Sequence, residues 1–399
     1  MQDKYDIVVV GAGPAGLSAA YAAAKNGASV IVLEKDDGIA YNVRTSGVSW
    51  IEEIRNFGIT EEHYNPIKNY AFFSPSNEVM INGKEPKCCV LNVRTAYQHL
   101  AFEAASAGAK IMVKANATNA IVNNKRISGV KVNMPKGELS INADLVIDAT
   151  GFNTAIGRKL GFVSEWKRYG VGAEYECYAE NVDSDTWTLM VGSEYSPAGY
   201  AWVFPLSKNS VRIGVGIGRP ESGEEPLDRL NAMLEKKVKP LDRMGKIEPV
   251  ELHYGFIPNE GVRESTVADG FILVGDSAGQ ANPLVLEGIR YAIEFGRLAG
   301  DIGAKSLQHG ATKESLQEYD QIWRSKVQSK IAAALKVQSR WLSLTDDQWD
   351  KEIEIINDMS IDEFLDFIRA DFSMSKMLKL ALHHPKTAAR QLFNMVLKS

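Results

Sequence analysis

The sequence predicts an α/β protein in which a βαβ domain is interleaved with a mostly antiparallel β domain and is followed by a helical C-terminal region. Three observations lead to this prediction. A complete βαβ unit begins at Asp6–Val10, and the segments from about Tyr169 to Arg219 alternate apolar and polar residues between Gly and Pro turns. From Ser315 onward, nearly every segment has helical periodicity.

Length and composition set the frame for these domains. A chain of 399 residues exceeds one small folding unit, because domains average roughly 100–200 residues. We expect a first domain from residues 1–165 together with 255–305, an antiparallel domain over 166–254 and a helical region over 306–399. The composition, 45% hydrophobic and 24% charged, is that of a globular protein. A net charge of −5 gives no general attraction for nucleic acid, so we expect no such partner.

The elements can be predicted in chain order. Asp6–Val10 is a strand, Pro14–Asn26 an alanine-rich helix and Ala28–Leu33 a second strand. Because a strand starts almost at once, we expect no signal peptide, and no run approaches the roughly 18 apolar residues of a spanning helix. Later elements are a helix around Ala96–Ala107, strands at Lys110–Val113, Arg126–Val132, Ala143–Ala149 and Phe271–Val274, and a long helix from about Gly288 to Lys305.

The three cysteines favour a reducing compartment. Cys88 and Cys89 are adjacent, and the set has neither the count of a disulfide framework nor the spacing of metal ligands. Adjacent cysteines bridge only with strain, so buried small residues are a better interpretation than a redox pair. We expect a cytoplasmic protein without a metal site.

The turn between the first strand and helix is the sharpest signal in the chain. In a Rossmann-like unit, Gly11 permits the tight turn, Gly13 lets a pyrophosphate approach the backbone and Gly16 allows close packing of helix on strand. Glu34 ends the second strand at the spacing of a carboxylate that accepts hydrogen bonds from ribose. An acid there disfavours a 2′-phosphate, so the cofactor is FAD or NAD.

A second motif, Gly275-Asp276-Ser-Ala-Gly279, follows the buried strand that ends at Val274. Together with the N-terminal glycine turn it resembles the flavoproteins related to para-hydroxybenzoate hydroxylase, which implies FAD. In that group the aspartate, here Asp276, holds the ribityl chain, and Pro283 and Gly288 lie where the backbone approaches the isoalloxazine. The alternative for Asp276 is a helix N-cap.

The same resemblance covers further residues. Arg94 matches the group's "Val-x-Arg" segment, where the arginine faces the ribityl or pyrophosphate region; a solvated arginine at a helix start is the alternative. Asp148-Ala-Thr-Gly151 resembles its second glycine motif, or is an ordinary turn. The residues that we assign to the cofactor are Gly11, Gly13, Ala15, Gly16, Glu34, Lys35, Arg44, Arg94, Asp276, Gly288 and Ile289.

The segment Pro197–Pro205 narrows the family. It resembles the "Pro-x-x-Tyr-x-Trp-x-Phe-Pro" signature of the geranylgeranyl reductase family, whose members saturate isoprenoid chains. Tyr200, Trp202 and Phe204 alternate along a strand and therefore share one face, where they would form an apolar wall that binds a prenyl chain. The alternative is an aromatic layer between sheets.

Two departures from that family concern the site. Archaeal members often carry a cysteine in a "Cys-Gly-Glu" turn, whereas this chain reads Asn42–Gly47, so Thr45, Ser46 or a bound water would replace the thiol in proton delivery. The glycine-rich turn before the flavin is altered to Leu284–Gly288. Catalytic residues are therefore unknown, with Tyr200, Trp202, Thr45 and Ser46 as candidates. We assign no role to the glycines of 214–218, which no helix follows.

The resemblance implies an FAD-dependent reductase of carbon-carbon double bonds in a geranylgeranyl-type lipid. An FAD-dependent monooxygenase or halogenase, and a quinone-linked electron-transfer flavoprotein dehydrogenase, are the alternatives. With one dinucleotide unit, the chain would need an external electron donor, either a nicotinamide or a ferredoxin-like protein. The basic, amphipathic tail from Phe372 would either lie on the inner membrane face as a peripheral contact or pack on the preceding acidic helices.

Overall fold

The structure is a computed structural model that describes residues 4–371, 376, 382 and 383. Nearly all of the predicted amphipathic tail, including 377–381 and 384–399, lies outside the described residues, so its two alternatives stay predictions. Among the described residues, no helix is long and apolar enough to cross a bilayer.

The first sheet confirms the predicted βαβ unit. In the described part of the chain it has eight strands, with β1 at its centre paired in parallel with β2 and β11. The strands β8 and β18 extend this parallel core, and β17, β9 and β10 add antiparallel pairs. The bounds are β1 (Lys4–Val10), β2 (Val30–Leu33), β8 (Lys110–Met112), β9 (Asn116–Asn123), β10 (Arg126–Met134), β11 (Gly137–Asp148), β17 (Val267–Ala268) and β18 (Phe271–Leu273).

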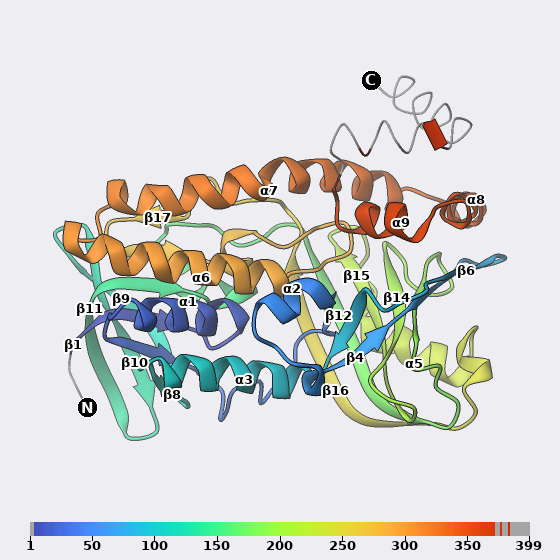
Figure 1. Cartoon of the computed structure of the whole chain (residues 1–399), viewed down its shortest axis with the longest axis horizontal. Coiled ribbons are helices and arrows are strands. Elements are labelled where there is room, and N and C mark those ends of the chain that lie inside the picture. Colours follow the sequence, from blue (N-terminus) through green and yellow to red (C-terminus); the bar gives the residue numbers. More distant parts are fainter. Residues whose placement is uncertain (1–3, 372–375, 377–381, 384–399) are drawn as a thin grey trace.

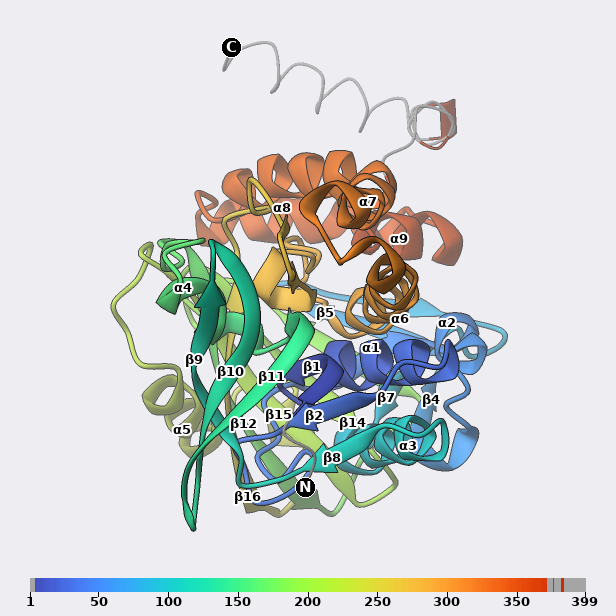
Figure 2. The ribbon, with the colours of Figure 1, turned by 90° about the vertical axis from the view of Figure 1, so that its left-hand side faces the viewer.

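Helices cover one face of this sheet. Ile7 and Val9 of β1 point to the face where α1, α3 and α6 pack, whereas Val8 and Val10 point to the opposite face, which β9 and β10 partly cover. Figure 2 shows α1, α6 and α7 stacked outward from the sheet in that order. The bounds are α1 (Pro14–Lys25), α3 (Val93–Ser106), α6 (Ile289–Ser306) and α7 (Lys313–Trp341).

The second sheet is antiparallel except where β13 pairs with β5 in parallel. Its order is β16-β12-β15-β14-β13-β5-β6, so strands from three separate chain segments meet in it. The bounds are β5 (Asn69–Phe73), β6 (Glu78–Asn82), β12 (Tyr169–Ala179), β13 (Thr186–Met190), β14 (Gly199–Pro205), β15 (Ser210–Arg219) and β16 (Ile247–Pro258).

The C-terminal helices lie over this sheet, and in Figure 1 α7 spans both parts of the molecule while α8 and α9 lie above the second sheet. Phe364 of α9 packs edge-on against Phe72 of β5, with ring centroids 5.1 Å apart. The remaining elements are α8 (Asp346–Asn357), α9 (Ile361–Ile368), α2 (Ile51–Asn56), α4 (Ala155–Lys159), α5 (Pro226–Lys236), a small sheet of β3 (Val48–Trp50), β4 (Tyr64–Ile67) and β7 (Cys88–Leu91), and 3-10 turns at Glu61–His63, Gly151–Asn153, Leu241–Arg243, Gly275–Ala278 and Leu307–His309.

The predicted fold class is confirmed, with parallel strands in the first sheet, an antiparallel second sheet and a helical C-terminal region. The strands β5, β6 and β9 were missed; β5 pairs with β6 and β9 pairs with β10 as hairpins, and β5 also pairs with β13, which is distant in the sequence. The three-part division at residues 165, 254 and 305 stays a prediction. Cys88 and Cys89 are free and buried, as predicted, and burial raises the pKa of Cys88 to about 12.

Candidate active site

The N-terminal glycine turn has the geometry of a pyrophosphate cradle. Gly11 has φ +99°, and a Cβ there would lie 2.4 Å from the Ala149 carbonyl oxygen. A Cβ on Gly16 would lie 1.9 Å from the Gly11 carbonyl oxygen, so helix and strand can pack only without a side chain. Around Gly13, by contrast, a Cβ would meet no atom within 4 Å. The open position at the start of α1 is therefore free for a ligand's phosphates, and the turn fits FAD.

Glu34 joins the end of β2 to this turn. Its Oε2 accepts a hydrogen bond from the Ala12 amide at 2.9 Å, and its Oε1 accepts from the Asp36 amide at 2.9 Å. The carboxylate is half-buried and each oxygen keeps a lone pair for another donor. Ala15 is buried in the first turn of α1, and Lys35 is exposed.

The second predicted motif meets the first in space. Ala15 Cβ lies 3.0 Å from where a Cβ on Gly275 would stand, although the two residues are far apart in sequence. Asp276 is the second residue of the 3-10 turn Gly275–Ala278, whose N-cap position is Val274, so the N-cap alternative does not hold. Burial, and then the charge of Glu287, raise the pKa of Asp276 to about 6. An Asp276 oxygen lies 3.1 Å from the Cβ position of Gly288, so the residues expected to touch ribityl chain and flavin ring are neighbours.

Two predicted arginines are paired with carboxylates. Arg44 Nη2 lies 2.7 Å from Asp36 Oδ2, and Arg94 Nη2 lies 2.7 Å from Glu251 Oε1 on β16. The Arg94 guanidinium also donates to the carbonyls of Ala40 and Tyr41 at 3.3 Å. Arg94 thus links α3, the loop before Thr45 and the second sheet, and its predicted contact with FAD stays a prediction.

A patch without side chains lies on the second sheet and forms the floor of the site. In register across β14, β15, β12 and β16, Tyr200 is followed by Gly216, Gly172 and Gly255. The neighbouring row is Trp202, Gly214, Glu174 and His253. The glycines of 214–218, to which we assigned no role from the sequence, therefore leave free the surface on which the rings of Tyr200 and Trp202 lie. Below, "glycine floor" means Gly170, Gly172, Gly214, Gly216, Gly218 and Gly255.

The indole of Trp202 lies across the glycine floor. A Cβ on Gly214 would be 2.3 Å from its Cζ2, and one on Gly216 would be 3.3 Å from its Cζ3. Its Nε1 donates to Glu174 Oε2 at 2.7 Å. Phe204 stacks on Trp202 with centroids 6.0 Å apart and on Trp187 with centroids 5.4 Å apart. Without glycine opposite it, Trp202 could not lie flat enough to reach Glu174.

A buried charge cluster lies at the end of the row that contains Trp202, Gly214, Glu174 and His253. Glu174 Oε1 lies 3.0 Å from His253 Nδ1 and 3.6 Å from Arg212 Nε, and all three side chains are at most 4% exposed. Arg212 Nη1 donates to the Ser46 and Leu91 carbonyls at 3.0 and 2.9 Å. The cluster therefore fixes Trp202 on one side and the Thr45–Ser46 loop on the other.

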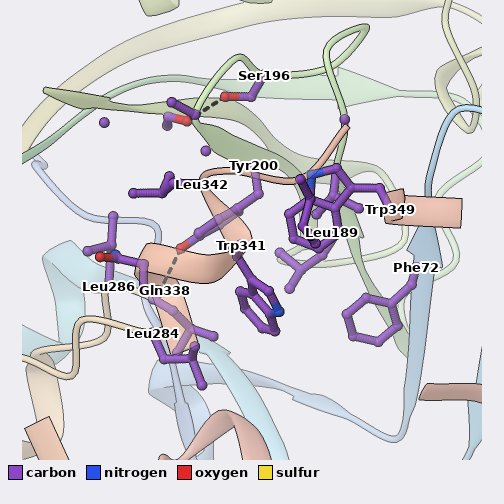
Figure 3. Close-up of a pocket in the computed structure, with 18 of the residues that line it drawn as sticks. Phe72, Leu189, Ser196, Tyr200, Leu284, Leu286, Gln338, Trp341, Leu342 and Trp349 are labelled. Atoms are coloured by element: carbon purple, nitrogen blue, oxygen red, sulfur yellow. Dashed lines mark hydrogen bonds between the residues drawn. The ribbon is translucent and has the colours of Figure 1, made fainter. Parts of the chain in front are cut away.

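Three cavities lie beside Tyr200, and Figure 3 shows one of them. The largest of these three, of about 390 Å³, is mostly apolar and runs between the second sheet and α7, α8 and α9. Two smaller ones of about 100 and 50 Å³ are both lined by Thr45 and Ser46, and Tyr200 and Leu286 line all three. Of the predicted aromatic wall, Trp202 lines only the 100 Å³ cavity and Phe204 only the 50 Å³ cavity. Gly288 and Ile289 also line the smallest.

Sequence reasoning missed several residues of this site. Glu174 and His253 are single polar residues in strands, and nothing local marks them as a pair. The aromatic lining from the C-terminal helices, Trp341, Trp349 and Phe367, looks like ordinary helix core in the sequence. The alternate glycines at 170 and 172 and at 214, 216 and 218 were a usable signal, because glycine in strand interiors often marks close approach of a ligand.

This fold and site define a flavin-binding oxidoreductase: a dinucleotide cradle lies at the carboxyl end of parallel strands, and an apolar cavity lies on an antiparallel sheet. Comparison with known families places it further. The FAD dependent oxidoreductase family matches residues 6–164, and the geranylgeranyl reductase catalytic domain matches residues 169–256. The chain belongs to the geranylgeranyl reductase family of FAD-dependent oxidoreductases, and its cofactor is FAD.

Relatives cover almost the whole chain. Digeranylgeranylglycerophospholipid reductase 2 of Methanococcoides burtonii is 31% identical, and the match covers 95% of each chain. The digeranylgeranylglycerophospholipid reductase of Methanosarcina mazei is 32% identical, also over 95% of each. The crystal structure of a geranylgeranyl bacteriochlorophyll reductase-like protein from Thermoplasma acidophilum has a TM-score of 0.86 at 25% identity and covers 98% of this chain and 99% of that one. A flavin-dependent brominase, at 19% identity, TM-score 0.68 and coverage of 92% and 93%, shares the fold alone.

Proposed function

We propose that this enzyme saturates the isoprenoid double bonds of a digeranylgeranylglycerophospholipid, the substrate class for which its 31–32% identical relatives are named. The observation that carries the proposal is the 390 Å³ apolar cavity, which meets the cavities at Thr45 and Ser46 beside Tyr200 and Leu286. A flexible apolar chain gains about 25 cal/mol for each Å² that it buries in such a cavity.

The residues of the chain would divide the work as follows. Gly13 and the first turn of α1 would hold the pyrophosphate of FAD, Glu34 the adenosine ribose and Asp276 the ribityl chain. When bound and reduced by the external donor, FAD would supply the hydride for reduction of an alkene carbon. The glycine floor and Tyr200 would orient the chain, and the surrounding apolar side chains would exclude water.

Saturation also requires a proton for the second alkene carbon. Thr45 and Ser46, which line both small cavities, are our candidates for holding it, directly or through a bound water. Tyr200 is a weaker candidate, because its hydroxyl already donates to the Val285 carbonyl at 2.6 Å and burial raises its pKa. In this proposal Tyr200 shapes the passage, and Trp202 and Phe204 support the floor beneath the chain.

The electron donor and location belong to the same proposal. The dinucleotide cradle would hold FAD, so an external donor, a nicotinamide or a ferredoxin-like protein, would reduce it. A phospholipid substrate resides in a bilayer, which supports a cytoplasmic enzyme that meets the inner membrane face peripherally.

The test uses the purified holoenzyme, reduced without oxygen and mixed with a geranylgeranyl glycerophospholipid in detergent micelles. We expect flavin reoxidation with the unsaturated lipid and none with its fully saturated counterpart. Trp341→Ala, in the apolar cavity, should raise KM about tenfold, as expected for one large side chain in a hydrophobic pocket. Phe102→Ala, on α3 and 72% exposed, is the control and should leave KM unchanged. No reoxidation by the lipid, together with oxygen-dependent incorporation of bromide into an added electron-rich aromatic compound, would instead indicate a halogenase.

A further inference from the structure

The loop between the Asp276 turn and α6 holds a residue in a disfavoured backbone conformation. Leu286 has φ +50°, in the left-handed region that side-chain-bearing residues rarely adopt. Such conformations persist only where the surrounding structure fixes them, and they concentrate at functional sites.

Hydrogen bonds from three directions fix this loop. Its ends are closed by the Asn282 amide donating to the Glu287 carbonyl at 2.8 Å and the Glu287 amide donating back at 3.2 Å. Gln338 of α7 donates to the Pro283 carbonyl at 2.6 Å, and the Tyr200 hydroxyl of β14 donates to the Val285 carbonyl at 2.6 Å (Figure 3). Asn282 in turn donates to the Ile368 carbonyl at the end of α9. The loop that contains Leu286 is therefore held by hydrogen bonds to α7, β14 and α9.

This conformation sends the Leu286 side chain onto the glycine floor. Its Cδ1 lies 2.7 Å from where a Cβ on Gly170 would stand, so the leucine occupies space that β12 leaves free. Leu286 lines the 390 Å³ cavity and both small cavities, whereas its neighbour Leu284 lines only the large one. The leucine thus lies between the apolar cavity and the cavities at Thr45 and Ser46, where a lipid chain that reached from one to the other would pass it.

We propose that Leu286 determines which double bond of the lipid chain is reduced, by narrowing the passage so that only one part of the chain can reach the side of the site at Thr45 and Ser46. This proposal rests on the proposed function, because it concerns the choice of bond within the same substrate.

The experiment counts positional isomers under limited reduction. The holoenzyme is given one pair of electrons from dithionite for each geranylgeranyl glycerophospholipid chain, and mass spectrometry after cleavage of the remaining double bonds identifies the saturated position. We expect one predominant dihydro isomer from the wild-type enzyme. Leu286→Ala and Leu286→Gly should lower the ratio of that isomer to the others by about tenfold, as a hydrophobic contact contributes to discrimination.

Matched variants separate an effect of Leu286 on the isomer ratio from effects on lipid binding and on folding. Leu286→Met keeps the volume and should keep the wild-type isomer ratio. Leu284→Ala widens the large cavity away from the passage, so it should raise KM with the isomer ratio unchanged. Retained FAD and an unchanged melting temperature show that a variant is folded, and Leu286→Gly, which relieves the backbone, provides a folded passage variant should Leu286→Ala lose stability.

The outcomes distinguish the two proposals. No reduction of the lipid by the wild-type enzyme contradicts the proposed function. Reduction with the same isomer ratio in wild type, Leu286→Ala and Leu286→Gly, or with no predominant isomer in the wild type, overturns the role of Leu286 while leaving the reductase intact.

Discussion

The cofactor cradle and the glycine floor both depend on glycine, but they differ in how the chain specifies them. The cradle is largely local: Gly11, Gly13 and Gly16 follow one another in a single turn, and outside the βαβ unit they meet the chain at Ala149, directly after β11. The floor is assembled: its glycines come from three strands, and their register alone aligns them. The first region can therefore be recognised as a motif, whereas the second exists only after the sheet has formed.

The largest effect is expected within the cradle, where substitutions of Gly16 and Gly13 should differ in whether the protein folds. Gly16→Val should prevent folding, because even its Cβ would lie 1.9 Å from the Gly11 carbonyl oxygen. Gly13→Val should leave the fold intact but lower FAD affinity by at least about tenfold, roughly 1.4 kcal/mol, since its side chain enters only the ligand's space. Circular dichroism and flavin titration check the pair. An unfolded Gly13→Val protein would contradict the assignment of its open side to a ligand.

The next effect tests the assembled region. Glu174→Gln removes the charge that faces Arg212 and His253 in a buried cluster, and should cost about 3–5 kcal/mol of unfolding free energy. Glu248→Gln, on β16 of the same sheet, is the control; its side chain is 56% exposed and pairs with the exposed Lys246, so the change should cost about 1 kcal/mol or less. Urea unfolding measures both. Equal losses of unfolding free energy in the two variants would mean that the buried cluster stabilises the fold no more than an exposed ion pair.

A pH experiment tests Asp276, whose pKa without FAD is raised from 3.8 to about 6. The folded state therefore binds this proton more tightly than the unfolded state. The contribution of Asp276 to the free energy of unfolding is thus highest below pH 4 and is lost as pH rises to about 6. The loss should be at most roughly 3 kcal/mol. Relative to wild type, Asp276→Asn apoprotein should gain stability across this interval by that amount, while the holoprotein binds FAD more weakly. If the difference in unfolding free energy between wild-type and Asp276→Asn apoprotein, measured in urea, does not depend on pH, the raised pKa of Asp276 is refuted.

The smallest effect concerns the contact between floor and loop. Tyr200→Phe removes the hydrogen bond to the Val285 carbonyl and should lower unfolding free energy by about 0.5–1.5 kcal/mol. FAD content should stay constant, because the hydroxyl lies outside the cradle. Thermal unfolding with flavin absorbance checks both; a loss of FAD would show that the loop and the cradle are coupled.

Much of the fold and of the cofactor site could be predicted from the sequence, because both are encoded in short segments. The strand at Asp6–Val10, its glycine turn and Glu34 lie within one supersecondary unit, and the aspartate of the late motif follows a buried strand directly. The substrate side was predicted less completely. Tyr200 lines all three cavities, yet Trp202 and Phe204 do not reach the largest one, since pairing with Glu174 and stacking on Trp187 draw them into the sheet.

By itself, the sequence determined the α/β class, the FAD cradle and the family, because local periodicity and closely spaced motifs record them directly. Only the tertiary structure decided that Glu174 meets His253, that alternate glycines of β12 and β15 align into one floor, and that Leu286 stands at the junction of the cavities. The physical reason is range: a turn or a strand depends on neighbours along the chain, whereas a cavity depends on the register and packing of segments that are distant in the chain.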